Sequence, residues 1–323
     1  MGKIVSVFNQ KGGVAKTATI NNLAFELTAR GKKVLMIDAD QQENLSVSVG
    51  IIPRQGYFTL FDLLCAEIED KPYKRDLSDA IVHTEYENLD LIVGSVQMAS
   101  MDEKLFSLME METPLDKFIQ SYKIDYSLQK KAEDEDFDES IEWFIKLETG
   151  FQNAKDEFLK ELQNQGFLTK KDGELIVKKL LSLVKDQYDY ILIDCPPALS
   201  AITKNMLNAS DCVLVPMTLE PFSASGLSHL VTSVDAIKQR KNPGLKFSGL
   251  LYTMVENRVV SKELKTEADY YKQFMYIYNT EIPRSADVNK AFALQMPLME
   301  YNADSTARIA YSKFCDEFLE REG

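Results

Sequence analysis

Short apolar runs alternate along this chain with longer segments in which apolar residues recur at helical spacing. The apolar runs predict buried strands at 3–8, 33–37, 89–95, 188–194, 211–216 and 247–255, with a further strand ending at 281–284. The helical spacing predicts helices at 16–30, 57–84, 175–184, 220–241, about 264–274 and 305–319. Strands that alternate with helices favour an α/β fold, a doubly wound and mostly parallel sheet flanked by helices.

The residues between the first strand and the first helix, 9–17, are rich in glycine and lysine. A strand, a glycine loop, a Lys-Thr pair and a helix, in this order, form the context of a phosphate-binding loop. Backbone N–H groups of such a loop surround an anion, a lysine at position 16 can reach the β- and γ-phosphates, and the Thr17 hydroxyl can bind Mg²⁺. We therefore expect a nucleotide to be bound by Lys11, Gly12, Gly13, Val14, Ala15, Lys16, Thr17 and Ala18.

Acidic residues end two of the other predicted strands. Asp38 and Asp40 follow the strand at 33–37, and Asp194 ends the strand at 188–194 just before a Pro-Pro pair. Open α/β sheets bind ligands in the crevice at the carboxyl ends of their strands. The three carboxylates are therefore expected beside the phosphate loop, although acidic residues can also simply end a strand.

Three motifs resemble those of the ParA, Soj and MinD ATPases. The loop resembles their deviant Walker A motif, K-G-G-x-x-K-[ST], with Ala15 at a position where many relatives have glycine. Residues 38–44 resemble the switch I motif D-x-D-P-Q-x-N, with Gln41 in place of the proline, and residues 188–197 resemble the Walker B strand Y-D-[YF]-I-[IL]-I-D-x-P-P. The resemblance covers roughly 1–108 and 186–323 and implies a P-loop NTPase fold.

The resemblance also implies a mechanism, in which the protein is a Mg²⁺-dependent ATP hydrolase that forms a homodimer around ATP. Its catalytic residues would be Lys11, which reaches the phosphates of the partner subunit, Lys16, and Asp40, which positions the attacking water. Thr17 would bind Mg²⁺ directly, and Asp38 and Asp194 would hold it through water. Met254 and Pro283 lie where the family contacts the adenine.

A stretch from about 109 to 186 is longer than the family core requires. Between Glu110 and Glu161 there are 15 acidic and 7 basic residues, so this part supplies −8 of the net charge of −13. Amphipathic patterns flank its acid-rich run Lys130–Glu139 and predict a helical insertion within a single ParA-like domain at 1–323. Its role stays open between a solvated elaboration and an element that contacts a partner protein or a second copy.

The distribution of charge indicates which partner the dimer binds. The net charge of −13 argues against a general nucleic-acid coat, but the segment from Lys238 to Lys290 has ten basic and six acidic residues, a local +4. ParA and Soj relatives bind DNA without sequence preference, and by resemblance the contacts here would be Arg258, Lys262, Lys265, Arg284 and Lys290. The acidic C-terminal segment disfavours the membrane binding of MinD relatives.

The expected function is therefore the partition of plasmid or chromosomal DNA, with a ParB-like centromere-binding protein that stimulates hydrolysis, in the cytoplasm and on the nucleoid. Two alternatives remain within the family, a MinD-like positioning ATPase that cycles on and off the membrane and a ParA-like carrier of a protein cargo. A metallocluster carrier of the iron-protein type requires paired cysteines, whereas the four cysteines here have no CxxC spacing. No signal peptide is expected, because an apolar strand begins at Lys3.

Overall fold

The computed structural model describes residues 2–53, 56–69, 77–110, 173–220, 223–256, 265 and 269–323. The chain divides into one compact unit of residues 1–106 and 173–323 and a second unit of residues 107–172. The predicted insertion at about 109–186 thus falls mainly outside the described residues, and its last part, from Gly173 onward, lies in the first unit.

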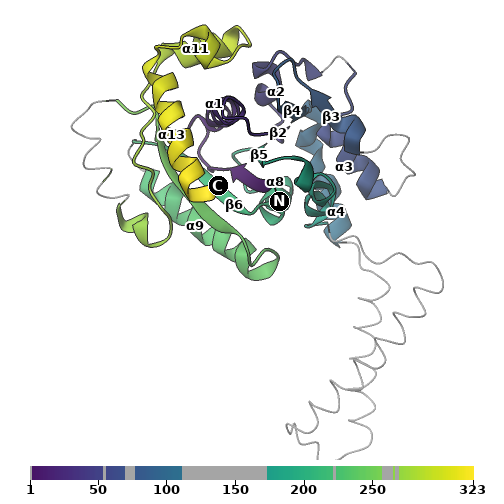
Figure 1. The fold of residues 1–323 in the computed structure, drawn as a ribbon. Helices are drawn as coiled ribbons and strands as arrows, with labels where there is room; N and C mark the ends of the chain where they lie inside the picture. Colours follow the sequence, from purple (N-terminus) through teal and green to yellow (C-terminus); the bar gives the residue numbers. More distant parts are fainter. Residues whose placement is uncertain are drawn as a thin grey trace, which may run out of the picture. The chain divides into compact units, whose positions relative to one another are not determined.

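A sheet of seven strands forms the centre of the first unit, counted over the described residues (Figure 1). The strands are β1 (Lys3–Val7), β2 (Val34–Asp38), β3 (Ile81–His83), β4 (Leu89–Ile92), β5 (Tyr190–Asp194), β6 (Cys212–Thr218) and β7 (Lys246–Thr253). Their order is β3-β4-β2-β5-β1-β6-β7, and every neighbouring pair is parallel except β3 and β4. The predicted doubly wound, mostly parallel sheet is confirmed.

Helices cover both faces of the sheet because its central strands are apolar on both sides. All residues of β2, β5 and β6 are buried, as expected for parallel strands between two helical layers. Among the described residues, the helices are α1 (Lys16–Thr28), α2 (Asn44–Ser48), α3 (Leu60–Glu69), α4 (Met101–Glu110), α7 (Ile176–Ser182), α8 (Ala201–Ala209), α9 (Ser223–Arg240), α11 (Ala286–Ala293), α12 (Leu298–Tyr301) and α13 (Thr306–Glu322). Helix α1 packs against α2 and α13, whereas α8 packs against α7 and α9.

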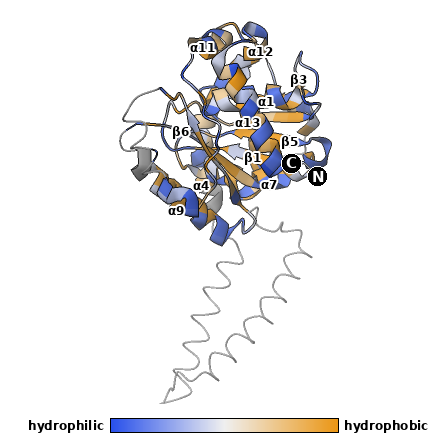
Figure 2. Cartoon of the chain, turned by 60° about the vertical axis from the view of Figure 1, so that its left-hand side comes forward, coloured by the Kyte–Doolittle hydropathy of each residue, from blue (hydrophilic) through white to orange (hydrophobic). Residues whose placement is uncertain are grey.

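Short 3-10 helices complete the described elements: η2 (Leu77–Ala80), η3 (Val96–Ser100), η4 (Lys185–Gln187) and η5 (Tyr270–Gln273). Figure 2 shows hydrophobic colour concentrated on the strands, while hydrophobic and hydrophilic residues alternate along α9 and α13. Within the described ranges, no helix combines the length and the apolar character needed to span a membrane.

Two sequence predictions of secondary structure were wrong. The helix predicted over 57–84 ends at Glu69, and Ile81–His83 forms the edge strand β3, which pairs with β4 in antiparallel register. A short apolar run cannot be assigned to helix or strand by spacing alone. The segment expected to end a strand at 281–284 belongs to no named strand, and only Pro283 in it forms an isolated bridge, with Val255. Helices α2, α8, α11 and α12 were not predicted.

Candidate nucleotide-binding site

The loop between β1 and α1 owes its shape to two residues with left-handed backbone. Gly13 has φ 73°, and Ala15 has φ 62° immediately before α1 begins. The side chain of Asn9 fastens the loop to β6, because its Nδ2 donates to the Pro216 carbonyl at 2.8 Å while its Oδ1 accepts from the Lys11 N–H at 3.0 Å. A left-handed conformation costs a non-glycine residue about 1–2 kcal/mol. The Ala15 methyl group therefore strains a loop that the rest of the structure holds in place.

Lys16 and Thr17, the first two residues of α1, lie at the centre of the site. Lys16 is buried, and its Nζ donates to the carbonyl oxygens of Asn9 and Lys11 at 3.3 Å each. Burial lowers the pKa of Lys16, and the nearby carboxylates of Asp194 and Asp40 oppose this shift. The Thr17 hydroxyl donates to Asp194 Oδ2 at 2.6 Å. A cation and a hydroxyl thus lie together at the N-terminus of a helix, where an anion is stabilised.

Asp38 and Asp194 are neighbours because β2 and β5 are parallel and pair these two residues directly. Both side chains are buried. Burial raises the pKa of Asp38 to about 6, against the effect of hydrogen bonds from Ser46, and burial together with repulsion from Asp38 raises the pKa of Asp194 to about 8. The Oδ1 atom of Asp194 is buried without a hydrogen-bond partner among the described residues. Carboxylate and hydroxyl oxygens are ligands that Mg²⁺ prefers, so the residues present fit this ion.

A cavity of about 530 Å³ opens beside the loop. Nine of the residues that were predicted to bind nucleotide or to act in catalysis line this cavity: Gly12, Gly13, Ala15, Lys16, Thr17, Ala18, Asp40, Met254 and Pro283. Its apolar wall, which was not predicted, consists of Ile282, Val288, Phe292 and Tyr311. The volume lies in the usual range for a small-molecule site, and the lining combines charged, polar and apolar side chains.

The side chain of Lys11 lies outside this cavity. It is partly exposed, and its Nζ pairs with Glu220 Oε2 at 2.6 Å in the segment that precedes α9. This hydrogen bond lowers the pKa of the Glu220 carboxyl. The two lysines therefore have different partners: the Lys11 ammonium contacts Glu220, whereas the Lys16 ammonium contacts carbonyl groups of the loop.

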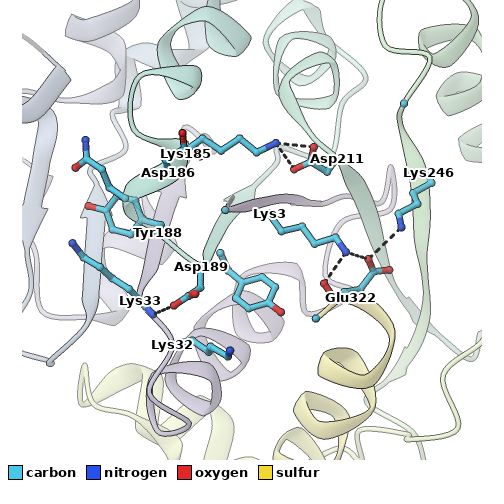
Figure 3. Close-up of a pocket in the computed structure, with 15 residues that line it drawn as sticks. Lys3, Lys32, Lys33, Lys185, Asp186, Tyr188, Asp189, Asp211, Lys246 and Glu322 are labelled. Carbon is cyan, nitrogen blue, oxygen red and sulfur yellow. Dashed lines mark hydrogen bonds and ion pairs between the residues drawn. The ribbon is translucent and has the colours of Figure 1, made fainter.

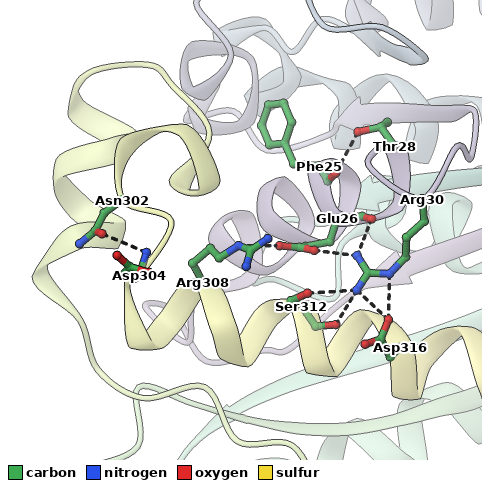
Figure 4. Close-up of polar contacts among 9 residues, drawn as sticks. All are labelled: Phe25, Glu26, Thr28, Arg30, Asn302, Asp304, Arg308, Ser312 and Asp316. Atoms are coloured by element: carbon green, nitrogen blue, oxygen red, sulfur yellow. Dashed lines mark hydrogen bonds and ion pairs between the residues drawn. The ribbon is translucent and has the colours of Figure 1, made fainter.

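The far end of α1 is bound to α13, the helix that contributes Tyr311 to the cavity (Figure 4). Arg30, just after α1, donates to Glu26 Oε2 at 2.7 Å and to Asp316 Oδ1 at 2.6 Å, and its NH2 also donates to the Ser312 carbonyl. Glu26 is buried, and its other oxygen lies 3.5 Å from the Nε of Arg308. These contacts hold α13 alongside α1 and thereby position one wall of the cavity.

The sequence matches the family described as an AAA domain over residues 2–128 and 147–247, more than half of the chain. The chain belongs to the AAA domain family. Two curated relatives of this AAA domain are named Soj. The sporulation initiation inhibitor protein Soj of Bacillus subtilis (strain 168) is 29% identical over 322 residues, with 98% of each chain covered. The chromosome-partitioning ATPase Soj of Treponema pallidum (strain Nichols) is 27% identical over 325 residues, with 100% of this chain and 99% of that protein covered.

One solved structure with the same fold as the AAA domain is cobyrinic acid a,c-diamide synthase from Mycobacterium smegmatis, with a bound ATP analog and magnesium. It has a TM-score of 0.67 and 23% identity, and the match covers 99% of this chain and 95% of that one. At this identity the likeness shows the fold alone. The predicted resemblance to Soj-type ATPases is confirmed by the family and by the Soj relatives.

The basic residues predicted to contact DNA lie in different settings on this AAA domain. Lys265 pairs with Glu281 at 2.5 Å, Arg284 lines the cavity and pairs with Glu256 at 2.8 Å, and Lys290 is exposed on α11. Arg258 and Lys262 lie outside the described residues. Arg284 thus lies at the cavity itself, whereas Lys290 does not line it and follows the lining residue Asn289 on α11.

A second hollow of the AAA domain, of about 710 Å³, lies at the amino ends of the parallel strands, at the opposite edge of the sheet (Figure 3). It is rich in lysine, but the Lys185 ammonium contacts both oxygens of Asp211 at 2.8 Å, and Lys3 and Lys246 both face Glu322. Carboxylates of the same chain thus neutralise these lysines, whereas the cavity beside Lys16 has backbone N–H groups and a helix N-terminus to offer a phosphate. The cavity at the carboxyl ends of the strands is the better nucleotide site.

Proposed function

We propose that this protein binds ATP with Mg²⁺ in the cavity beside the loop and hydrolyses it to ADP and phosphate. The observation that carries the proposal is the contact of Thr17 with Asp194 at 2.6 Å, next to the buried Lys16 and an Asp194 oxygen without a partner among the described residues. A hydroxyl, a carboxylate and an ammonium at a helix N-terminus are the groups that P-loop ATPases use. The ATP analog and magnesium in the related fold support the same ligands.

The roles of the residues follow from their places. Lys16 and the N–H groups of Gly12, Gly13, Val14 and Ala15 would bind the β- and γ-phosphates, and the adenine would lie against Met254 and Pro283, which line the cavity. Thr17 would hold Mg²⁺ directly, and Asp38 and Asp194 would hold it through water. When bound, Mg²⁺ neutralises charge on the transferring phosphoryl group. Asp40, which also lines the cavity, orients the attacking water.

Replacing Lys16 with alanine tests nucleotide binding. We expect Lys16→Ala to weaken Mg²⁺-ATP binding by about 100-fold, because a charge-assisted hydrogen bond to phosphate is lost. Lys33→Ala is the matched control, since Lys33 lies at the opposite edge of the sheet. Isothermal titration with a non-hydrolysable ATP analog measures both variants. Wild-type affinity in Lys16→Ala would exclude this cavity as the phosphate site.

We further propose that two copies enclose ATP between them, with Lys11 of each copy reaching the phosphates of the other. The Lys11 side chain is 40% exposed, and its partner Glu220 is 51% exposed. An ion pair this exposed contributes little to stability, so exchange of Glu220 for a phosphate costs little. Lys11 and Lys16 would then both stabilise negative charge in the transition state, while Asp40 orients the attacking water.

The dimer is proposed to bind DNA without sequence preference and to partition it with a ParB-like centromere-binding protein, on the nucleoid in the cytoplasm. The name of the Treponema pallidum relative, a chromosome-partitioning ATPase, supports this role. The segment from Lys238 to Lys290 has a net charge of +4 in a chain with a net charge of −13, which supports DNA as the surface that the dimer binds. Its contacts would be Arg258, Lys262, Lys265, Arg284 and Lys290.

Co-sedimentation tests DNA against membrane. With Mg²⁺-ATP, the protein is expected to sediment with nonspecific DNA, to lose affinity as salt is raised, and not to sediment with anionic liposomes. Arg284→Glu with Lys290→Glu is expected to weaken DNA binding, whereas Lys33→Glu at the opposite edge of the sheet leaves it intact. Sedimentation with liposomes alone would favour the MinD-like alternative.

A further inference from the structure

The Asp40 carboxylate lies on a tight turn whose closing residue is Glu43. The Glu43 N–H donates to the Asp40 carbonyl at 3.1 Å, so residues 40–43 form a β-turn with Gln41 and Gln42 at its centre. Glu43 is itself left-handed, with φ 57° and ψ 18°, and stands immediately before α2. Left-handed backbone is uncommon for a residue other than glycine, asparagine or aspartate, so the surroundings must hold Glu43 in this conformation.

The Glu43 carboxylate supplies that constraint. Its Oε1 accepts a hydrogen bond from the Val96 backbone N–H at 2.6 Å. Val96 begins η3, the short helix that follows β4. A short bond to an ionised acceptor is among the stronger kinds of hydrogen bond. The turn that carries Asp40 is thus tied through a side chain to the segment that follows β4.

A second contact joins the same two segments. Ser46, which is fully buried in α2, accepts from the Gly94 N–H at 3.0 Å and donates to Asp38 Oδ2 at 2.7 Å. Gly94 lies so close that a Cβ there would be 2.7 Å from Asp38 Cγ. The segment 94–96 between β4 and η3 therefore contacts Asp38 through Ser46 and the Asp40 turn through Glu43.

We propose that Glu43 is a positioning residue for ATP hydrolysis, which holds the Asp40 carboxylate in place through its bond to the Val96 N–H; this inference rests on the proposed function. Within the turn, the Gln42 N–H donates to Asp40 Oδ1 at 3.0 Å, so the carboxylate moves with the turn that carries it. Gln41 occupies the turn position that proline favours, and its N–H donates to no described residue. Nothing in the covalent structure fixes φ at position 41, and the bond from Val96 to Glu43 ties the whole turn to the segment after β4.

Steady-state kinetics with Mg²⁺-ATP test this role through three variants. Glu43→Ala is expected to lower kcat by about 10- to 100-fold, the cost of a misplaced catalytic group, with the KM for ATP within about twofold of the wild-type value. Glu43→Gln keeps an amide oxygen for the Val96 N–H and is expected to retain most of kcat. Adding Gln41→Pro to Glu43→Ala is expected to restore most of kcat, because proline fixes φ within the turn. Glu87→Ala, an exposed glutamate in the turn before β4, is the matched control.

Amide hydrogen exchange at Val96 in the nucleotide-free protein tests the tether without reference to hydrolysis. Exchange is expected to accelerate in Glu43→Ala and to stay near the wild-type rate in Glu43→Gln. If the wild type hydrolyses ATP and Glu43→Ala keeps its kcat, the positioning role is overturned while the proposed function stands. If Glu43→Ala loses kcat and Gln41→Pro restores none of it, the role is likewise overturned. If the wild type hydrolyses no ATP while Val96 exchange follows the expected order, the proposed function fails and the tether alone remains.

Discussion

Replacing Arg30 with alanine tests how the phosphate-binding helix is held against α13. Arg30 makes its shortest contacts to Glu26 at 2.7 Å and to Asp316 at 2.6 Å. The two acidic partners differ in exposure, because the Glu26 side chain is 4% exposed and the Asp316 side chain is 62% exposed. The loss of Arg30 therefore destabilises the protein mainly through Glu26, because this buried carboxylate cannot be solvated in place of its lost partner.

The expected magnitude follows from that asymmetry. Removing one partner of a buried ion pair typically lowers the free energy of unfolding by about 3–5 kcal/mol. For Arg30→Ala we expect about 2–3 kcal/mol, because Arg308 remains 3.5 Å from Glu26 and Arg30 is itself partly exposed. Asp316→Ala removes only an exposed partner and is expected to cost less than about 1 kcal/mol. Adding Glu26→Gln to Arg30→Ala is expected to recover about 1 kcal/mol, because no unpaired buried charge is left.

Urea unfolding, followed by circular dichroism at neutral pH, measures the three variants against the wild type. The predicted order of the free energy of unfolding is wild type, Asp316→Ala, the double variant and Arg30→Ala, from highest to lowest. If Arg30→Ala costs no more than Asp316→Ala, Glu26 does not depend on Arg30, and the account of how α1 and α13 are joined is refuted.

Three further predictions concern the loop and the carboxylates. Ala15→Gly removes the cost of a left-handed alanine and is expected to raise the free energy of unfolding of the nucleotide-free protein by about 0.5–1 kcal/mol. Ala18→Gly, within α1, is expected to lower it by about 1 kcal/mol, and thermal melts compare the two variants. Lys11→Ala is expected to bind Mg²⁺-ATP as the wild type does but to stay monomeric with ATP in sedimentation velocity. An ATP-dependent dimer of this variant would contradict the proposal that Lys11 of each copy reaches the phosphates of the other. Gly94→Ala places a Cβ 2.7 Å from Asp38 Cγ and is expected to cost about 1–3 kcal/mol in urea unfolding, with slower hydrolysis.

The sheet and the phosphate loop could be predicted from the sequence because both depend on local patterns. Continuous apolar runs are typical of strands covered on both faces, and they located β1, β2 and β5 to within a few residues. Parallel order brings the carboxyl ends of the strands together, so acidic residues at the ends of two such runs predict that Asp38 and Asp194 lie close together, as β2 and β5 confirm.

The remaining features depend on contacts between residues distant in sequence. The pattern of α13 predicted an amphipathic helix, but not that Tyr311 would face the nucleotide cavity. The pairing of Lys11 with Glu220 joins residues 209 positions apart and left no local signal. The edge strand β3 is only three residues long, and its pairing with β4 rather than its own composition makes it a strand.

The most direct test of the central claim, that this cavity hydrolyses ATP and that hydrolysis releases the protein from DNA, is the dissociation rate of Asp40→Ala from nonspecific DNA with Mg²⁺-ATP. Asp40 lines the cavity and is assigned to orient the attacking water. The account predicts that this variant binds ATP, hydrolyses it at least about 100-fold more slowly than the wild type, and remains on DNA as a dimer. Hydrolysis and release at the wild-type rates would contradict it.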